Sequence, residues 1–273
     1  MKDDFGQRMK QYEGLESDRR FMPLLPIMAR LDGKSFHSFC RGLEKPFDKY
    51  FREIMTEVTK YLVKETGALV GYTQSDEISL VWYSDKYESQ VFFDGRIAKM
   101  TSVLAAMASS KFNRLLPDYL PFKAHLMPLF DCRVWQVPNQ TEAANVFLWR
   151  EMDAVRNSVA LAAQSQFSHK ELFGKSCEVM KDMLLTRGID WGKYPDEFKR
   201  GVWIRKTRVT RPFTTTEINK LPPKHQARTN PDLQVERWEI QTLEMPLFQA
   251  VMNRGAVIFD GAKPKVGGPN DPY

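Results

Sequence analysis

The order of short apolar runs and long, helically spaced stretches in the first 140 residues constrains the fold more than any other feature. The run from Ile27 to Leu31 lies just after two prolines and predicts a short buried strand. It leads directly into Asp32-Gly33, a dipeptide that is typical of turns. The first predicted strand therefore ends at an acidic residue.

A long amphipathic helix is predicted between this strand and a hairpin. It opens at Pro46 and ends at Gly67, and its apolar residues recur at helical spacing on one broad face. Those residues are Phe47, Tyr50, Phe51, Ile54, Met55, Val58, Tyr61 and Leu62. Two β-like runs follow, Ala68 to Tyr72 and Ile78 to Tyr83, and the polar residues between them predict an acidic hairpin tip.

A second helix and a further strand complete the order of elements. The helix is expected over Gln90 to Leu115, and the strand over Leu129 to Val137. The resulting order, β-α-β-β-α-β, matches the ferredoxin-like pattern. We therefore predict an α+β fold in which helices cover an antiparallel sheet.

The chain beyond residue 140 is expected to add further helices and strands and one polar linker. The helices are expected over Thr141 to Gln166, Lys175 to Leu185 and Trp238 to Asn253, the strands over Val202 to Val209 and Ala256 to Phe259, and the linker over Thr214 to Asp232.

Composition narrows the classes of partner and compartment. The formal charge of +6 and the pI of about 9.1 favour an anionic partner such as nucleic acid. Three widely spaced cysteines, Cys40, Cys132 and Cys177, form no CxxC pair, which argues against a zinc site or a disulfide framework. The polar N-terminus lacks the apolar core of a signal peptide, and no apolar run approaches a membrane span. We expect a cytoplasmic protein with no membrane partner.

Three acidic residues lie at positions that the predicted topology brings together. Asp32 ends the first strand, and Asp76 and Glu77 occupy the hairpin tip, so Asp32 and Asp76 can face each other in one sheet. Two carboxylates held close repel each other unless a cation lies between them. Oxygen ligands select hard ions such as Mg²⁺, and two such ions can serve phosphoryl transfer. The alternative interpretation is a plain Asp-Gly turn and a solvated hairpin tip.

Basic residues flank this acidic group. Lys34, His37 and Lys45 follow Asp32 within a short loop and the start of the helix, where they could meet a triphosphate. Arg96 and Lys99 lie three residues apart near the N-terminal end of the second helix, an end that favours anions. The alternatives are surface solvation for each lysine and arginine, and a packed histidine at position 37.

Several segments of the sequence resemble signatures of one enzyme family. Arg30 to Phe39 reads RLDGKSFHSF and is similar to the R-L-D-G-x-x-F-H-x-F motif of the tRNA-histidine guanylyltransferase family. Tyr72 to Val81 reads YTQSDEISLV and resembles its Y-x-Q-S-D-E-x-S-x-V signature. Lys45 to Asp48 and Phe130 to Val134 resemble the family's K-P-x-D and F-D-x-R-V segments. The similarity covers about residues 5 to 150 and fades towards residue 205.

The resemblance implies a palm like that of ordinary polymerases, run in the opposite direction. A 5′-monophosphate RNA end would be activated with ATP or GTP, and the 3′-hydroxyl of an incoming nucleoside triphosphate would then attack it. The palm-like catalytic domain would span residues 1–140, residues 141–205 would complete it, and 206–273 would form a C-terminal extension of unknown role. Members of the family are typically tetramers, so we expect a homotetramer that binds tRNA.

The resemblance also assigns roles to individual positions. Asp32, the Gly33 carbonyl and Asp76 would bind two Mg²⁺ ions, and Glu77 would support catalysis. The nucleotide-binding positions would be Lys34, Ser35, Phe36, His37, Lys45, Ser75, Arg96 and Lys99, the last two holding a triphosphate.

One departure separates this chain from the family members that are specific for histidine tRNA. Those members carry His-Ile-Asn-Asn where this chain reads Val155-Arg156-Asn157-Ser158. Val155 replaces the histidine associated with choosing that tRNA, so the chain resembles the broader branch that repairs truncated tRNA 5′ ends by templated addition. Asn157 persists and Lys181 lies near an expected family lysine, and we expect both to contact RNA.

Templated 3′-to-5′ nucleotide addition to tRNA is the main functional hypothesis, with Arg205, Lys206 and Arg208 as further RNA contacts. One alternative is strict addition of G at position −1 of histidine tRNA. Another is a palm-type cyclase, which joins a nucleoside triphosphate to itself and needs no basic RNA surface. A non-enzymatic RNA-binding module would use the basic stretch Lys199 to Arg211, but the close acidic pair argues against it, because such a pair is costly without a cation.

Overall fold

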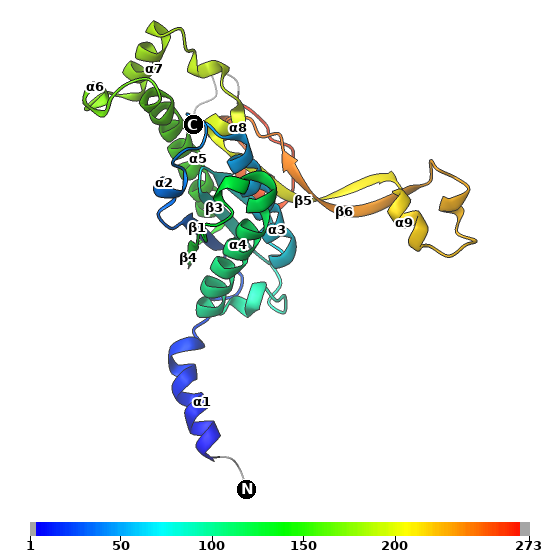
Figure 1. The fold of residues 1–273 in the computed structure, drawn as a ribbon. Helices are drawn as coiled ribbons and strands as arrows, with labels where there is room; N and C mark the ends of the chain where they lie inside the picture. The colour runs from blue at the N-terminus through cyan, green and yellow to red at the C-terminus, as the bar shows by residue number, and fades with distance from the viewer. Residues whose placement is uncertain (1–3, 268–273) are drawn as a thin grey trace.

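A mixed sheet-and-helix body makes up most of the computed structural model, which describes residues 4–267 (Figure 1). Within that range one antiparallel sheet has six strands in the order β4-β1-β3-β2-β5-β6. The strands are β1 (Ile27–Gly33), β2 (Val70–Gln74), β3 (Glu77–Trp82), β4 (Phe130–Gln136), β5 (Val202–Pro212) and β6 (Gln234–Leu243). The first four strands and the two long helices between them follow the predicted β-α-β-β-α-β order, so the α+β prediction is confirmed.

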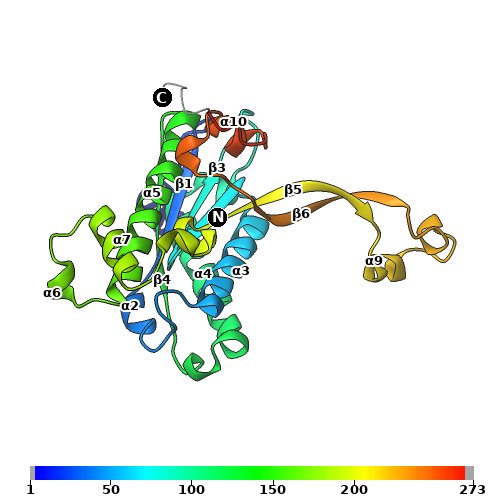
Figure 2. The ribbon, with the colours of Figure 1, turned by 90° about the horizontal axis from the view of Figure 1, so that it is seen from above.

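Helices cover both faces of the sheet. On one face lie α3 (Lys49–Thr66) and α4 (Ile97–Tyr119), and on the other lie α5 (Gln140–Gln164) and α10 (Arg254–Phe259) (Figure 2). The remaining α-helices are α1 (Asp4–Ser17), α2 (Phe36–Phe39), α6 (His169–Leu172), α7 (Cys177–Thr186), α8 (Asp196–Arg200) and α9 (Thr215–Lys220). The first of them, α1, stands away from the body (Figure 1). No helix within residues 4–267 is both long enough and apolar enough to cross a membrane.

Alternation along the strands divides the core between the two faces. Leu31 and Leu80 point towards α3 and α4, whereas Met28 and Val81 pack with Phe147 of α5. Because strand side chains alternate with a period of two, the even-numbered positions of β1 all face α5. Asp32 is one of these positions, and it lies on the α5 side at the end of the strand.

The predicted hairpin and helix boundaries need small adjustments. The side chain of Asp48 accepts a hydrogen bond from the Phe51 N–H, so α3 begins at Lys49 rather than at Pro46. A short 3₁₀ turn, Phe92–Gly95, precedes α4, which therefore begins at Ile97. The residues between the predicted and the observed starts of these two helices are polar or aromatic, and their spacing gives no strong helical periodicity.

The C-terminal predictions were wrong in three places. Instead of a helix from Trp238, the chain forms β6, because its residues pair with β5 from Trp203↔Leu243 to Pro212↔Gln234. Instead of a last strand, Ala256 to Phe259 belongs to α10, whose apolar side chains pack against α5. The predicted linker contains α9, which begins with a capping box between Thr214 and Glu217.

Strands β5 and β6 form a two-stranded arm that leaves the body and carries α9 near its tip (Figures 1 and 2). The inner end of β5 belongs to the sheet, since Thr73↔Val202 to Val70↔Arg205 pair in register. The boundary expected after residue 205 therefore falls inside one continuous strand. The described residues after 205 also do not stand apart, because the segment Phe248 to Ile258 returns to the core.

The returning C-terminal segment is fastened to α5 by a buried carboxylate. Glu151 is 1% exposed, and its Oε2 accepts a hydrogen bond of 2.7 Å from the Phe248 N–H. The Trp203 indole faces the same carboxyl group. Burial raises the pKa of Glu151 to about 7.

Glu151→Gln keeps an acceptor for the Phe248 N–H and removes the ionisable group. The pKa of Glu151 lies near 7 in the folded chain and near its ordinary value of 4.5 in the unfolded chain, so folding favours the protonated acid. Its contribution is complete below the unfolded value and is lost as the pH rises through the folded value. We expect the native chain to lose on the order of 3 kcal/mol relative to the variant across this window. Urea unfolding of both proteins at several pH values measures the difference, and parallel pH dependences would contradict it.

Candidate functional site

The acidic residues predicted to meet do lie at one end of the sheet. Asp32 of β1 is the direct cross-strand partner of Glu77, the first residue of β3. The Gly33 N–H donates to the Asp76 carbonyl at 3.1 Å, which brings the turn between β2 and β3 against the end of β1. Two carboxylates far apart in sequence thus face a shared space.

The backbone around these residues needs special conformations. A Cβ on Gly33 would lie 2.4 Å from the Phe36 ring, so only glycine leaves room for that ring. Ser35 and Ser75 both adopt left-handed backbone conformations, with φ of 58° and 49°. These tight turns lie next to Asp32 and Asp76 at one end of the sheet.

Phe36 does not have the role expected of it. Its side chain is 2% exposed and packs with Phe39, Phe51, Phe112 and Phe130 beneath the site. A ring buried in an aromatic cluster is not placed to contact a nucleotide, so the side chain of Phe36 supports the loop from below and only its backbone faces the site loop. The spacing of the aromatic residues on α2 and α3 could have indicated this.

The electrostatics of the acidic end favour a bound cation. Burial raises the pKa of Asp76, and the nearby Asp32 carboxylate raises it further, against hydrogen bonds from the backbone and Ser75. Burial also raises the pKa of Glu77, but Arg150 opposes this by donating from Nε and Nη2 to the two carboxylate oxygens at 2.7 and 2.8 Å. Glu77 is therefore neutralised by a protein cation, whereas Asp32 and Asp76 are not.

The donor set fits magnesium. In residues 4–267 no group of three His, Cys, Asp or Glu side chains could hold a metal by itself. Asp32 and Asp76 offer two carboxylates, and the neighbouring main chain offers carbonyl oxygens. A hard cation that keeps water and substrate phosphates in its shell needs no more protein ligands than these.

A cavity of about 580 Å³ opens beside the acidic residues. Its walls come from the β2–β3 turn, the segment before α3, α5 and α8, and include Asp32, Lys45, Ser75, Asp76 and Asn157. Lys34, Ser35 and His37 are exposed on the neighbouring loop and do not line it. The space is wide enough for a nucleotide.

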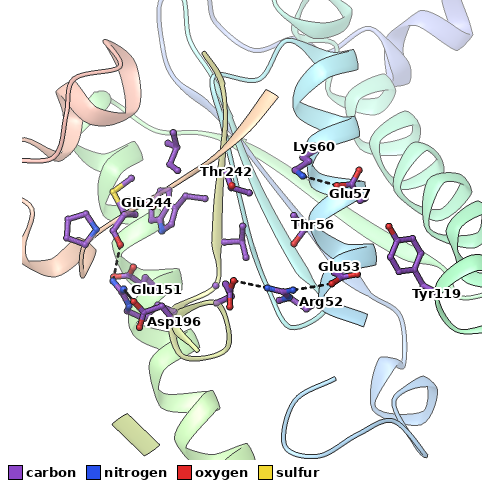
Figure 3. Close-up of a pocket in the computed structure, with 18 residues that line it drawn as sticks. Arg52, Glu53, Thr56, Glu57, Lys60, Tyr119, Glu151, Asp196, Thr242 and Glu244 are labelled. Carbon is purple, nitrogen blue, oxygen red and sulfur yellow. Dashed lines mark hydrogen bonds and ion pairs between the residues drawn. The ribbon is translucent and has the colours of Figure 1, made fainter. Parts of the chain in front are cut away.

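A second cavity, of about 1010 Å³, lies at the sheet edge between α3, α8 and the end of β6 (Figure 3). Its charged groups mostly pair with one another, as Lys60 does with Glu57 and Arg200 with Asp196. The ion pair between Arg52 and Glu197 lies in the walls of both cavities. The acidic pair borders only the smaller cavity, which is therefore the candidate active site.

Comparison with known proteins decides the family. A family profile described as tRNAHis guanylyltransferase matches residues 6–138. The solved structure of a bacterial tRNA(His) guanylyltransferase-like protein in complex with ATP is similar, with a TM-score of 0.73 and 33% identity, covering 90% of this chain and 94% of that one. The chain belongs to the tRNA(His) guanylyltransferase family. As a member of that family it is a nucleotidyltransferase that acts in tRNA processing.

Two further comparisons agree. The tRNA(His) guanylyltransferase of Schizosaccharomyces pombe is 28% identical over 213 residues, which are 72% of this chain and 79% of that protein. The bacterial guanylyltransferase-like protein in complex with GTP has a TM-score of 0.69 and 30% identity, covering 90% of this chain and 94% of that one. The resemblance drawn from the sequence motifs is therefore confirmed.

Arg96 and Lys99 lie at the opposite end of the sheet from the acidic pair. The Ile97 N–H donates to the Arg19 carbonyl, and Phe92 stacks on Trp82, the last residue of β3. The site end of the sheet instead contacts the C-terminal half of α4. Within one guanylyltransferase chain, these two basic residues and the acidic pair cannot hold the same triphosphate.

The expected RNA contacts fall into two groups. Asn157 is exposed in the cavity wall, while the Lys181 ammonium lies 4.1 Å from the centre of the Trp191 ring. Lys206 and Arg208 are exposed on one face of the arm. The same face carries Trp238, the cross-strand partner of Arg208, which is 62% exposed. Sequence reasoning missed Trp238 because it was assigned to a helix.

Arg205 differs from its two neighbours on β5. Its guanidinium donates to the carbonyls of Val257 and Ile258 in α10, the second at 3.0 Å, and burial lowers the pKa of the group. These bonds satisfy carbonyl groups in the last turn of a helix. Arg205 therefore holds the C-terminal segment, and these two bonds turn its guanidinium towards α10.

Arg205→Gln and Arg208→Gln form a matched pair. Losing the Arg205 bonds leaves buried carbonyls without donors, so we expect its variant to lose about 2 kcal/mol of unfolding free energy. Within residues 4–267 Arg208 forms an ion pair only with the exposed Glu236, so its variant should change stability by less than about 1 kcal/mol. Urea unfolding measures both, and equal losses would remove the structural role given to Arg205.

Proposed function

We propose that this protein adds nucleotides to the 5′ end of tRNA in a template-dependent, 3′-to-5′ direction. The observation that carries the proposal is the placement of Asp32 and Asp76 together at a cavity that Lys45 and Asn157 also line. Acidic and cationic groups around one space suit a reaction between phosphates. Membership of the guanylyltransferase family supports the same chemistry.

Asp32, Asp76 and the Gly33 carbonyl would hold two Mg²⁺ ions. Such ions, when bound, activate the attacking oxygen and stabilise the leaving one. The chain itself fixes the two carboxylates on adjacent strand ends and keeps Glu77 paired with Arg150. Its turns therefore place charge before the substrate arrives, which lowers the cost of reorganisation during the reaction.

Two displacement steps account for the proposed activity. First, a 5′-phosphate oxygen of the RNA attacks the α-phosphorus of ATP or GTP, and pyrophosphate leaves as the new P–O bond forms. Second, the 3′-hydroxyl of an incoming nucleoside triphosphate attacks the activated RNA phosphorus. The nucleoside monophosphate leaves with the electron pair of the broken bond, and the hydroxyl proton passes to water.

The cavity provides contacts for the nucleotide. Lys45 is exposed in its wall and suits a phosphate, and the Ser75 hydroxyl lies on the turn that carries Asp76. Lys34 and His37 are exposed on the adjacent loop, within the same matching motif. The bacterial relatives in complex with ATP and with GTP support nucleoside triphosphates as substrates.

The arm and the far end of α4 suit other parts of the substrates. Arg208 is the cross-strand partner of the exposed Trp238, and the Lys206 ammonium lies 5.7 Å from the centre of its ring, so this face offers cations and a stacking surface to RNA. Arg96 and Lys99 would hold a triphosphate at a separate position, away from the acidic pair. We further propose that the chain assembles as a homotetramer, as its family relatives are expected to do.

Asp32→Asn and Asp76→Asn each remove one charged ligand while keeping the shape of the side chain. We expect nucleotide addition to fall roughly a thousandfold or more, because metal ligation supplies several kcal/mol of transition-state stabilisation. Incorporation of a labelled nucleotide into 5′-truncated tRNA measures the rate.

Asp131→Asn is the matched control for these two variants. Asp131 is the cross-strand partner of Asp32 on the other side, but its side chain is 54% exposed and does not line the cavity. Its variant should keep near-normal turnover. Near-normal turnover by a folded Asp32 or Asp76 variant would remove the metal site from the proposal.

Position 155 favours templated repair over strict modification of histidine tRNA. Val155 is half-buried on α5, two residues before the cavity residue Asn157, and does not itself line the cavity. An aliphatic side chain cannot hydrogen-bond or stack on an anticodon base as an imidazole can. Selection then rests on pairing between the incoming nucleotide and the opposite base of the acceptor stem.

Truncated tRNAs of different identity and different opposing base test this choice. We expect each to accept the nucleotide that completes a Watson–Crick pair, whatever its anticodon. The measurement is the identity of the added nucleotide with each triphosphate supplied in turn. Addition of G alone, dependent on a histidine anticodon and indifferent to the opposing base, would instead establish strict tRNA-histidine modification.

A further inference from the structure

A buried ion pair connects the acidic end of the sheet to α5. Arg150 donates from Nε to Glu77 Oε1 at 2.7 Å and from Nη2 to Oε2 at 2.8 Å. Both side chains are less than 10% exposed. Such a two-pronged pair between an arginine and a carboxylate fixes orientation as well as charge.

Arg150 is itself held in place by a second carboxylate. Its Nη2 also donates to Asp153 Oδ2 at 2.9 Å, one helical turn further along α5. Asp153 in turn accepts from Arg156 at 2.7 Å and from Asn157 at 3.4 Å. The guanidinium thus joins the strand that begins with Glu77 to the side of α5 that borders the cavity.

The position of Glu77 makes this pair matter for metal binding. Glu77 follows Asp76 directly and lies opposite Asp32 in the sheet, so three carboxylates border the cavity here, while Asp131 on the other side of Asp32 does not line it. Arg30 is the other nearby cation, but its Nε lies 3.8 Å from Glu77, beyond hydrogen-bond reach. Only Arg150 therefore occupies both oxygens of Glu77 among the side chains within residues 4–267.

We propose that Arg150 is a positioning residue for the metal site: it holds Glu77 out of the coordination sphere, so that Asp32 and Asp76 alone supply its carboxylates. This inference rests on the proposed function. Asp153 orients Arg150 for the task. The cations keep open positions for substrate phosphates, since a third carboxylate would fill coordination sites that the triphosphate needs.

Replacing Arg150 should change how the protein binds metal in the absence of nucleotide. If Glu77 is released, it becomes available as a third ligand, so metal affinity without nucleotide should rise while catalysis falls. A merely structural arginine would act in the opposite sense, because loosening the site would weaken metal binding. Metal affinity therefore separates the two roles.

The experiment measures Mn²⁺ binding to the full chain without nucleotide or RNA, by electron paramagnetic resonance of the free ion. Arg150→Met should bind Mn²⁺ roughly tenfold more tightly than the native chain, because carboxylate count tunes affinity. Nucleotide addition by the same variant should fall roughly 10- to 100-fold, as is common for groups that orient metal ligands.

Two further variants separate ligation from simple loss of a positive charge. In Glu77→Gln/Arg150→Met the released carboxylate is absent, so Mn²⁺ affinity should return to within about twofold of the native value. Lys64→Met is the control, since it removes an exposed cation of α3 that pairs with Glu65 and touches neither Glu77 nor Asp153. Its Mn²⁺ affinity should equal that of the native chain.

Unchanged or weaker Mn²⁺ binding by Arg150→Met, or tight binding that persists in the double variant, would overturn the inference. If Arg150→Met does not fold, Arg150→Lys provides the same test, because lysine keeps the charge but cannot form the paired bonds. Asp32→Asn distinguishes failure of the proposed metal site from failure of the role given to Arg150. If it leaves the Mn²⁺ affinity of the native chain unchanged, the proposed metal site itself is wrong; if it abolishes binding, only the role of Arg150 is in question.

Discussion

The register between β1 and β3 is the constraint on which the rest of the structure depends. It makes Asp32 and Glu77 direct partners and places Leu31 and Ile78 together on the opposite face. A slip of one residue would turn every side chain of β1 over, burying Asp32 among the aromatic rings and exposing Leu31. The hydrophobic requirement of the core therefore fixes the positions of the carboxylates, and the same packing serves stability and chemistry.

The acidic end of the sheet shows how a folded chain can hold carboxylates that repel one another close together. Burial disfavours the charged forms of both Asp76 and Glu77, but the two carboxylates have different hydrogen-bond partners. Glu77 receives an internal partner in Arg150, while Asp76 receives only a serine hydroxyl and backbone donors. A carboxylate paired with an internal cation is held in one position, whereas a carboxylate without such a partner can pair with a bound cation.

The sequence was sufficient for the parts of the molecule governed by local pattern. Strands β1 to β4 and helices α3 and α4 follow from apolar spacing and turn residues, and their order alone brought Asp32 near Asp76. Less could be predicted where the contacts of a residue depend on a partner far away in the sequence. Glu77 pairs with Arg150 across 73 positions, which depends on how α5 lies on the sheet.

The C-terminal region illustrates the same limit. Trp238 lies in a strand because its segment pairs with β5. The sequence around Trp238, taken alone, shows neither a clear helical nor a clear strand periodicity. Arg205 looks like its basic neighbours in the sequence, yet alternation along β5 directs it towards α10 while Lys206 points to solvent. Phe36 lies inside a functional motif, but its ring is required by the core beneath.

The arm is continuous with the sheet, and this has a mechanical consequence. Because β5 pairs with β2 before it leaves the body, the arm is a direct extension of the sheet. The direction of the arm follows from the twist between neighbouring strands of the sheet. The strand β2 that sets this direction also leads into the turn bearing Asp76. An RNA bound to the arm as proposed would be aligned by the strand that leads to Asp76, so the length of β5 would set the distance between the two contacts.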